Sequence, residues 1–451
     1  MIKLFKCGIL LLSMLLFTIP SFAQELPANA VENVMIHLSD GSVVNSGTIV
    51  WRNGVIEAVG EDAEIPFDAH VMDGGDSLHV YPGFINGLTT WGSPDRGDLE
   101  SADDPGNPGY ERAGIQPDRS PGELLKADDK NLEEGLKYGI TTAMLSLKGE
   151  MLPGRSDIFF LHGEKTESGL FEQDKGVVFQ FEGARGGFSN RAYPNTTMGV
   201  MAKFRQLMYD AEALKDHIDY FASAEGGIPA PERDEVLESL FPILDKHIPL
   251  YFVTDSPEDL ERFFALQDEF GFSAVVVSGK NIWHKADALA DKNIPVLASV
   301  ELPKMPNWYK KEKEEENSEN EEDTETDEEP EDDLTTEEEL FRERQLKSYL
   351  QTVRNISSLM KAGVSVGFSG GGLDPDKFGD HFKVLMDEGE LNQNDLIKIL
   401  TANTAEILQI SDKTGDIKPG NIASFSIRTE PFGEEKSKVF KTVSNGQIYE
   451  F

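Results

Sequence analysis

Eight short apolar runs, separated by stretches with helical periodicity, constrain the fold of this chain more than any other feature of its sequence. Each run is three to six residues long, and together they occupy residues 84–88, 140–145, 177–181, 220–222, 250–253, 274–277, 296–300 and 364–368. Strands of a parallel sheet look like this in sequence because helices cover both faces of the sheet.

Amphipathic patterns of helical length lie between the apolar runs, at residues 124–138, 198–214, 234–247, 257–270, 282–291 and 337–362. Regular alternation of strand and helix is typical of α/β proteins with a parallel sheet. Eight repeats predict a TIM-like (β/α)8 barrel over residues 82–414, and a doubly wound open sheet is the main alternative.

Both ends of the chain are rich in β signals and differ from the middle. Asn53-Gly54 separates two apolar β-branched runs, and Asn445-Gly446 does the same near the far end. Asn-Gly between apolar runs favours a two-residue hairpin turn. The two ends, residues 24–81 and 415–451, are therefore predicted to form one small composite β-sandwich domain.

The first 23 residues have the pattern of a secretory signal peptide. Lys3 and Lys6 precede an apolar run, and Ser21-Phe22-Ala23 provides a small-x-small cleavage site. This predicts an exported protein, periplasmic or extracellular, and no later apolar run reaches the length of about 18 residues that suggests a membrane span. The single cysteine, Cys7, lies in the predicted signal peptide, so the mature chain is expected to contain neither disulfides nor a thiol nucleophile.

The chain is strongly acidic, with a formal net charge of -39. This charge argues against nucleic acid and anionic membranes as partners, because both require concentrated Lys and Arg. Much of the charge is local: 15 acidic residues against one base, Lys313, lie between residues 312 and 333. Such a composition cannot bury enough apolar surface to fold, so residues 310–334 are predicted to be a disordered acidic insert within the barrel. A calcium-binding or partner-binding role is the alternative, although the spacing of an EF-hand is missing.

Three separated phrases together resemble the amidohydrolase superfamily. They are Gly-Val-Ile-Glu-Ala-Val-Gly at 54–60, Val-Tyr-Pro-Gly-Phe-Ile-Asn at 80–86 and Gly-Asp-Ile-Lys-Pro-Gly-Asn-Ile-Ala-Ser at 415–424. Residues 234–250, followed by 255–260, further resemble the imidazolonepropionase-like branch. The resemblance implies a catalytic barrel that hydrolyses carbon-nitrogen bonds, with a divalent metal held by histidines and a carboxylate at the strand ends.

Aligned with that family, this chain has no metal ligands at the expected places. The first strand would end in His-x-His and the last in Ser-Asp or Thr-Asp, and the fifth and sixth strands would each supply a histidine. The five ligand positions read Leu88, Thr90, Val253, Ser278 and Gly370. Hydroxyls are weak zinc ligands on their own, and the remaining three side chains offer no donor atom. The bridging lysine of some relatives has no counterpart between Lys215 and Lys246 either.

Replacement sites are not evident among the other polar residues. None of the eight histidines forms a His-x-His or His-x-x-x-His pair. Four groups of polar residues could in principle bind a metal or act as nucleophile, acid or base, but a structural role is the simpler explanation for each. They are His162 near Glu164; Asp374, Asp376, Asp380 and His381 after the last strand; the serines Ser146, Ser223 and Ser369; and the carboxylates Glu182 and Glu225. The sequence therefore assigns no catalytic, cofactor-binding or metal-binding residue, and no cofactor.

Further phrases, at 107–117, 193–199 and 434–439, together with the acidic insert, resemble the first half of large secreted amidohydrolases with two tandem barrels. In that group the first barrel lacks the metal site and the second retains it. The resemblance implies a non-catalytic binding or scaffolding subunit, whose partner would be a separately encoded active amidohydrolase barrel, in a homo- or hetero-oligomer. The alternative is a hydrolase of carbon-nitrogen bonds that uses a non-standard site.

Overall fold

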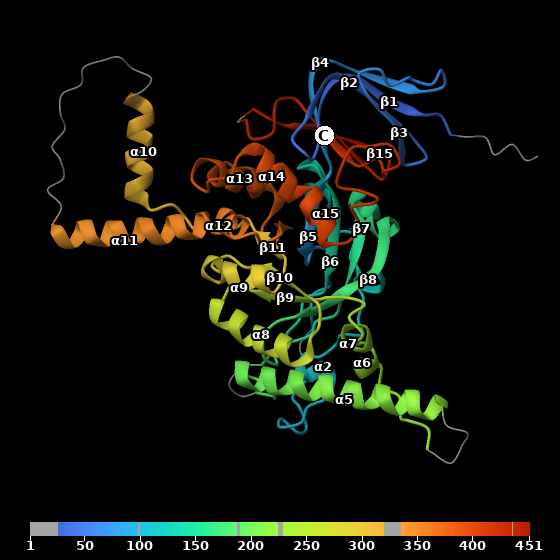
Figure 1. The fold of residues 1–451 in the computed structure, drawn as a ribbon, viewed down its shortest axis with the longest axis vertical. Helices are drawn as coiled ribbons and strands as arrows, with labels where there is room; N and C mark the ends of the chain where they lie inside the picture. Colours follow the sequence, from blue (N-terminus) through green and yellow to red (C-terminus); the bar gives the residue numbers. More distant parts are fainter. Residues whose placement is uncertain (1–25, 98–99, 187–189, 224–228, 320–334, 435) are drawn as a thin grey trace, which may run out of the picture.

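The computed structural model describes residues 26–97, 100–186, 190–223, 229–319, 335–434 and 436–451, and it contains two sheets (Figure 1). The signal-peptide prediction falls on residues 1–23, which lie outside the described residues. None of the helices within the described residues is both long and apolar enough to cross a membrane.

The first sheet has seven strands drawn from both ends of the chain. Its members are β1 (Asn29–His37), β2 (Val43–Arg52), β3 (Val55–Gly60), β4 (His70–Pro82), β13 (Phe425–Arg428), β14 (Val439–Ser444) and β15 (Gln447–Glu450). The order is β15-β14-β13-β4-β1-β2-β3, so β4 joins the N-terminal strands to the C-terminal ones by pairing with β13. One apolar cluster contains Val31, Trp51 and Val80 together with Phe425 and Val443. The prediction that both chain ends build one sheet is confirmed.

The second sheet has eight strands in sequence order. They are β5 (Phe84–Thr89), β6 (Ile140–Ser146), β7 (Arg155–Phe160), β8 (Leu170–Phe179), β9 (Leu250–Thr254), β10 (Ala274–Ser278), β11 (Val296–Ser299) and β12 (Val366–Ser369). The two outermost strands approach one another, because an isolated parallel bridge joins Thr89, the last residue of β5, to Gly371, just beyond β12. The hydroxyl of Thr89 also donates to the Gly371 carbonyl at 2.9 Å.

Two details of the predicted strand set are wrong. Residues 220–222 are not a strand but the last turn of helix α5 (Thr197–Ser223), where Tyr220 and Phe221 are exposed. The missing strand is instead β7, which was not predicted. It runs antiparallel to β6 and to β8, so the eight strands are not all parallel as a regular (β/α)8 pattern requires.

Apolar side chains cover both faces of the eight-stranded sheet, as its short apolar strands require. One cluster, which includes Leu88, Met144, Tyr251 and Leu297, lies on one face. The larger cluster on the other face includes Phe179, Phe252 and Phe263 of β8, β9 and α8, whose rings are in mutual contact.

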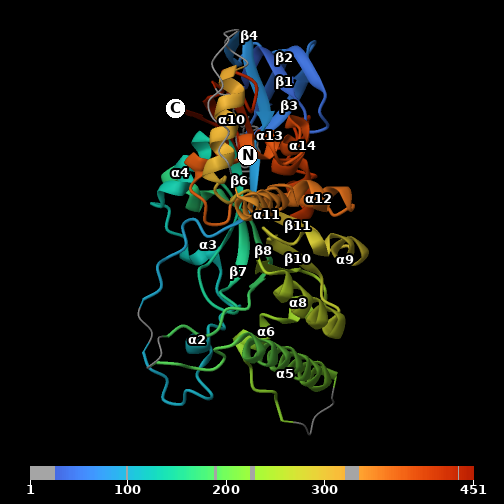
Figure 2. The same ribbon diagram turned by 90° about the vertical axis from the view of Figure 1, so that its left-hand side faces the viewer.

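Helices follow most strands of the second sheet (Figures 1 and 2). The α-helices, besides α5, are α2 (Tyr110–Ala113), α3 (Pro121–Leu124), α4 (Lys130–Lys137), α6 (Glu235–Glu238), α7 (Phe241–Leu244), α8 (Pro257–Phe270), α9 (Ala286–Asp291), α10 (Asn307–Glu319), α11 (Thr336–Val353), α12 (Asn355–Lys361), α13 (Phe378–Asp387), α14 (Gln393–Leu400) and α15 (Ala402–Ile407). Short 3-10 helices occupy Gly163–Gly169, Trp283–Lys285 and Pro375–Lys377.

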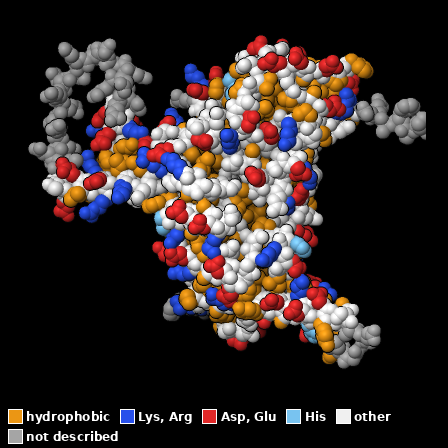
Figure 3. Space-filling model, viewed as in Figure 1, with side chains coloured by type: hydrophobic (Ala, Val, Ile, Leu, Met, Phe, Trp, Pro, Cys, Tyr) orange, Lys and Arg blue, Asp and Glu red, His pale blue; other side chains and the backbone are white. Residues whose placement is uncertain are grey.

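Helices α10 and α11 project from the body as an arm (Figure 1). The two helices contact each other through Trp308, whose Nε1 donates to Oε1 of Gln345 at 2.8 Å. Leu340 and Phe341 are exposed on this arm, where Figure 3 shows hydrophobic side chains at the surface. The predicted disordered insert begins inside α10, so that prediction is wrong for residues 310–319, while residues 320–334 lie outside the described residues.

Candidate functional site

The carboxyl ends of the parallel strands surround a cavity of about 300 Å³, which we call the strand-end cavity. Its walls come from β5, β6, β8, β9, β10 and β12 and from the residues that follow them: Leu88, Thr89, Thr90, Ser146, Leu147, Lys148, Gly149, Pro153, Val178, Gln180, Glu182, Val253, Val277, Ser278, Ser369, Gly371 and Gly372. Four of the five expected ligand positions are among them, and the fifth, Gly370, lies between two lining residues. The structure thus brings together residues that are far apart in sequence.

Neighbouring side chains leave little space for a larger residue at Gly370. Its backbone N–H donates to Oδ1 of Asn86 at 2.8 Å. A Cβ atom at this position would lie 2.7 Å from Nδ2 of Asn86 and 2.9 Å from Cζ of Phe378, closer than packed atoms tolerate. A side chain at Gly370 would therefore require the side chains of Asn86 and Phe378 to shift. The neighbouring Gly372, in contrast, has open space around it.

The floor of the cavity is apolar. Leu88 is 4% exposed and packs in the same cluster as Val178 and Val277, with Val253 against it. Beneath them lies Tyr251, which is completely buried, and burial raises the pKa of its phenol. Two of the expected ligand positions, Leu88 and Val253, are therefore part of the apolar core.

A polar network crosses three adjacent strand ends on one side of the cavity. The hydroxyl of Ser278 donates to Oδ1 of Asp255 at 2.5 Å. Lys280 Nζ lies 3.3 Å from Asp255 Oδ2 and 2.7 Å from Glu301 Oε2. Partial burial opposes the ammonium, but the hydrogen bond to Glu301 and the charge of Asp255 outweigh it, so the pKa of Lys280 is raised.

Ser278 has a left-handed backbone, with a φ of 77°. Residues other than glycine rarely adopt this conformation, which costs about 1 kcal/mol and persists where neighbouring groups hold the backbone in place. Here Asp255 holds both the Ser278 hydroxyl and the backbone N–H of Lys280, the latter at 3.2 Å. Sequence reasoning missed this network because Asp255, Lys280 and Glu301 lie in separate loops whose charges look like ordinary solvated residues.

Two of the serines considered as nucleophiles line the cavity, but their hydroxyls donate to backbone carbonyls. The Ser369 hydroxyl donates to the Leu88 carbonyl at 2.7 Å, and that of Ser146 donates to the Thr89 carbonyl at 3.4 Å. Neither is within hydrogen-bonding distance of a histidine or carboxylate in the described part of the chain. The third serine, Ser223, does not line the cavity. It is the last residue of α5, and its hydroxyl donates to the Tyr220 carbonyl at 2.8 Å.

Glu182 and Lys148 are the charged groups on the rim of the cavity. Glu182 keeps contact with solvent, yet burial against the wall raises the pKa of its carboxyl. Gln180 fixes the adjacent loop, since its Nε2 donates to the carbonyls of Gly149 and Glu150 at 2.6 and 2.8 Å. Glu225, which was considered together with Glu182 in the sequence analysis, lies outside the described residues.

The remaining predicted polar groups have structural roles. Nδ1 of His162 lies 2.7 Å from the Tyr449 hydroxyl, which ties β15 to the second sheet, and Glu164 lies in the adjoining 3-10 helix. His381 Nδ1 accepts from the Leu302 backbone at 3.2 Å. In the loop after β12, Asp374 pairs with Lys377 at 3.1 Å without capping the following 3-10 helix by its side chain.

The residues at the strand ends do not fit a divalent metal. Zinc in such a site takes imidazole nitrogens, thiolates or carboxylate oxygens. Leu88 and Val253 lack a donor atom, Gly370 has no side chain, and Ser278 already donates to Asp255. Nowhere in the described ranges do three or more His, Cys, Asp or Glu side chains gather in a metal-binding arrangement.

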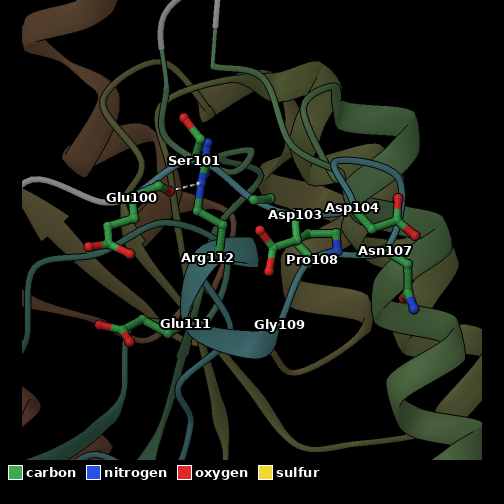
Figure 4. Close-up of a pocket in the computed structure, with 10 residues that line it drawn as sticks. Glu100, Ser101, Asp103, Asp104, Asn107, Pro108, Gly109, Glu111 and Arg112 are labelled. Atoms are coloured by element: carbon green, nitrogen blue, oxygen red, sulfur yellow. Dashed lines mark hydrogen bonds between the residues drawn. The ribbon is translucent and has the colours of Figure 1, made fainter.

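A second hollow, of about 500 Å³, lies along residues 100–112 (Figure 4). It is lined by Glu100, Asp103, Asp104 and Glu111, with Arg112 among them. The Arg112 guanidinium donates to the carbonyls of Glu100, Arg185 and Asn190, so its donors organise the surrounding loops. This hollow shares no lining residue with the strand-end cavity.

Comparison with solved structures agrees with the family resemblance. An amidohydrolase from Thermotoga maritima MSB8 superposes with a TM-score of 0.72 at 20% identity, covering 94% of this chain and 100% of that one. A Xaa-Pro dipeptidase with methionine bound in its active site gives a TM-score of 0.53 at 14% identity, covering 94% and 100%. A prolidase in complex with N-methylphosphonate-L-proline gives 0.53 at 13% identity, covering 94% and 99%.

These neighbours are amidohydrolases and prolidase-like members of the amidohydrolase superfamily, and the likeness establishes the amidohydrolase fold for this chain. The fold implied by the three short phrases is thereby confirmed, while the resemblance to the first half of tandem enzymes stays a prediction. No protein-family model and no curated protein matches the sequence.

Proposed function

We propose that this chain is an exported protein with the amidohydrolase fold that has exchanged metal-dependent hydrolysis for binding. It acts as a non-catalytic binding or scaffolding subunit, and its partner is a separately encoded amidohydrolase with an intact metal site. The proposal includes the closed barrel and the composite sandwich of that fold, which the bridge between Thr89 and Gly371 and the joint sheet of both chain ends support.

The observation that carries the proposal is the close packing around Gly370. If the ligands had simply been lost, the vacated positions would leave space for their return. Instead, the side chains of Asn86 and Phe378 occupy the space that a Cβ at position 370 would need, and Leu88 belongs to the core. Cores are packed closely, so a side chain cannot be added there without a shift of its neighbours. In this proposal the chain retains the amidohydrolase fold, and packed side chains stand where the family has metal ligands.

The partner is tested by isolation of the tagged, full-length chain from its native host at moderate salt. We expect a second amidohydrolase to co-purify and to carry the hydrolytic activity of the complex. The isolated chain should retain no stoichiometric zinc, iron or manganese after dialysis against the free metal, measured by elemental analysis. A chain that purifies alone, or that holds about one such metal per molecule, would overturn the proposal.

A second candidate function is hydrolysis of carbon-nitrogen bonds without the usual metal site. The observation in its favour is Glu182, whose raised pKa suits a general acid or base at a cavity rim. The discriminating experiment compares wild type with Glu182→Gln on a panel of dipeptides and cyclic amides. Turnover by the isolated chain that falls at least about a hundredfold in Glu182→Gln would favour the enzyme, since general acid-base catalysis contributes that much.

A further inference from the structure

A separate cavity of about 270 Å³ lies between the seven-stranded sheet and helix α13, and we call it the seam cavity. Its walls include Tyr138, Phe382, Arg428 and Phe432. It shares no residue with the strand-end cavity. Arg428 ends β13, Tyr138 follows α4 and Phe382 belongs to α13, so three separate parts of the fold meet here.

Arg428 is the unusual residue in this cavity, because it is a buried cation without an anionic partner. Its exposure is 6%. Nη2 donates to the Tyr138 carbonyl at 2.8 Å, but Nε is buried and has no hydrogen-bond partner. No carboxylate of the described residues lies within 4 Å of the guanidinium. Burial lowers the pKa of Arg428 to about 10, which leaves the side chain charged at neutral pH.

Aromatic rings compensate for only part of that burial. The guanidinium lies 5.3 Å from the centroid of Phe84 and 5.3 Å from that of Phe432. A cation–π contact replaces only part of the hydration that an ion loses on burial, and it leaves the N–H donors unpaired. Because Nε is enclosed by protein atoms, an anion that enters the cavity would accept from the terminal Nη donors of Arg428.

The surroundings of Arg428 define the shape of that anion. A guanidinium presents a planar fork that matches a carboxylate. Phe382 and Phe432, each 6% exposed, form apolar aromatic walls on which a flat ring can pack. The volume is at the lower end of the range for small-molecule sites. Asp380, Lys383 and Glu434 line the cavity and are exposed, so its rim carries charges of both signs.

We propose that the seam cavity binds a small aromatic monocarboxylate, with the carboxylate on Arg428 and the ring packed against the contacting pair Phe382 and Phe432, whose centroids are 5.7 Å apart. This site is independent of the proposed scaffolding role, because it lies apart from the strand-end cavity and uses none of its residues. An occupied seam cavity would join β13, α4 and α13, and binding there would stabilise the contact between the two sheets.

The test is calorimetric titration of the full-length chain with benzoate, and with benzamide as the neutral ligand of equal shape. We expect saturable binding of benzoate and at least about tenfold weaker binding of benzamide, because a charge-assisted hydrogen bond to a buried arginine contributes more than 1.4 kcal/mol. A crystal soaked with 4-bromobenzoate should show an anomalous bromine peak in the seam cavity, beside Phe382 and Phe432. Equal affinity for benzoate and benzamide, or no binding of either, would overturn the proposal.

Variants separate ligand recognition from structural support. Arg428→Met should weaken benzoate binding at least about tenfold, while Arg344→Met, which removes the same charge from an exposed position on α11, should leave it unchanged. If Arg428→Met fails to fold, Ser437→Leu is the second variant. It keeps Arg428 and fills part of the cavity from a half-buried lining position, so it should weaken benzoate binding. Benzoate binding that survives Ser437→Leu at full strength contradicts the assignment to the seam cavity.

Discussion

The backbone N–H of Gly370 donates to Oδ1 of Asn86 at 2.8 Å, and this bond connects the last strand of the second sheet to the first. In the family pattern the last strand carries a carboxylate at the position of Gly370, and Asn86 belongs to the Val-Tyr-Pro-Gly-Phe-Ile-Asn phrase that carries the resemblance. The backbone of Gly370, where the family has a carboxylate, is thus hydrogen-bonded to the side chain of Asn86 on the first strand. A side chain at position 370 would have to displace the side chains of Asn86 and Phe378.

Restoring the carboxylate should damage the fold. Gly370→Asp places a Cβ atom 2.7 Å from Asn86 and 2.9 Å from Phe378, so we expect a loss of about 1–3 kcal/mol in the free energy of unfolding, the usual cost of overpacking. Gly372→Asp is the matched control, because it adds the same charge at the same cavity where no atom lies within 4 Å of its Cβ. Urea denaturation of both variants measures the difference. Equal stability of the two would show that the packing around Gly370 is not tight.

Leu88 should behave as a core residue and not as a vacant site. Leu88→Ala removes a side chain that is 4% exposed, and large-to-small changes in a core cost about 2–5 kcal/mol. Leu340→Ala, at a position that is 45% exposed on α11, should change stability by less than about 0.5 kcal/mol. Thermal and urea unfolding of both variants provide the comparison. A Leu88→Ala protein as stable as wild type would contradict a core role.

Sequence patterns predicted the strands wherever the apolar residues are continuous. Strands β5, β6, β9, β10 and β11 lie close to the predicted runs. The approach failed at β7, which begins Arg155-Ser156-Asp157. Asp157 is buried but accepts from the Ser120 hydroxyl at 2.5 Å and from the Gly122 and Asp174 backbones at 2.7 and 2.8 Å. Partners far away in sequence satisfy this strand's polar residues, and hydrophobic periodicity cannot detect them.

The opposite error arose at residues 220–222, where an apolar run suggested a strand. Tyr220 is 64% exposed and Phe221 41% exposed, so the run is neither buried nor extended. Helix α5 continues through it because nothing in the preceding sequence ends a helix there, and the run is only three residues long. For the site, the family pattern located the cavity correctly. It could not reveal the Asp255, Lys280 and Glu301 network, which exists only once three loops meet.

That network should contribute a measurable but modest coupling. Lys280→Met and Glu301→Gln, alone and combined, form a double-mutant cycle across the 2.7 Å ion pair. Both side chains are partly exposed, so we expect a coupling of about 0.5–1 kcal/mol in low salt, reduced in 1 M salt by screening. The cycle is read from urea denaturation. The exposed pair of Lys310 and Glu314 on α10, 3.7 Å apart, serves as the control and should couple less. A coupling near zero at low salt would contradict a structural role for Lys280.

Acid should weaken the seven-stranded sheet through a pair of histidines. Nε2 of His37 lies 3.0 Å from Nδ1 of His79, and the His37 ring stacks on Tyr81. Burial, aided by the charge of His79, lowers the pKa of His37 to about 4, and burial also lowers the pKa of His79. Because His37 in the unfolded chain has a pKa near 6.5, the unfolded state takes up a proton between pH 6.5 and 4 that the folded state refuses. Its contribution to stability is complete above pH 6.5 and declines as the pH falls toward 4.

The measurement is the free energy of unfolding between pH 7 and 4 for wild type and His37→Gln. Glutamine cannot titrate, so the variant should lose up to one proton from the pH dependence, and its stability curve should be flatter in this window. His70→Gln is the control, because His70 is exposed at the start of β4 and should leave the slope unchanged. Parallel curves for wild type and His37→Gln would show that the His37 and His79 pair does not cause acid sensitivity, and the cause would then lie in the carboxylates of the chain.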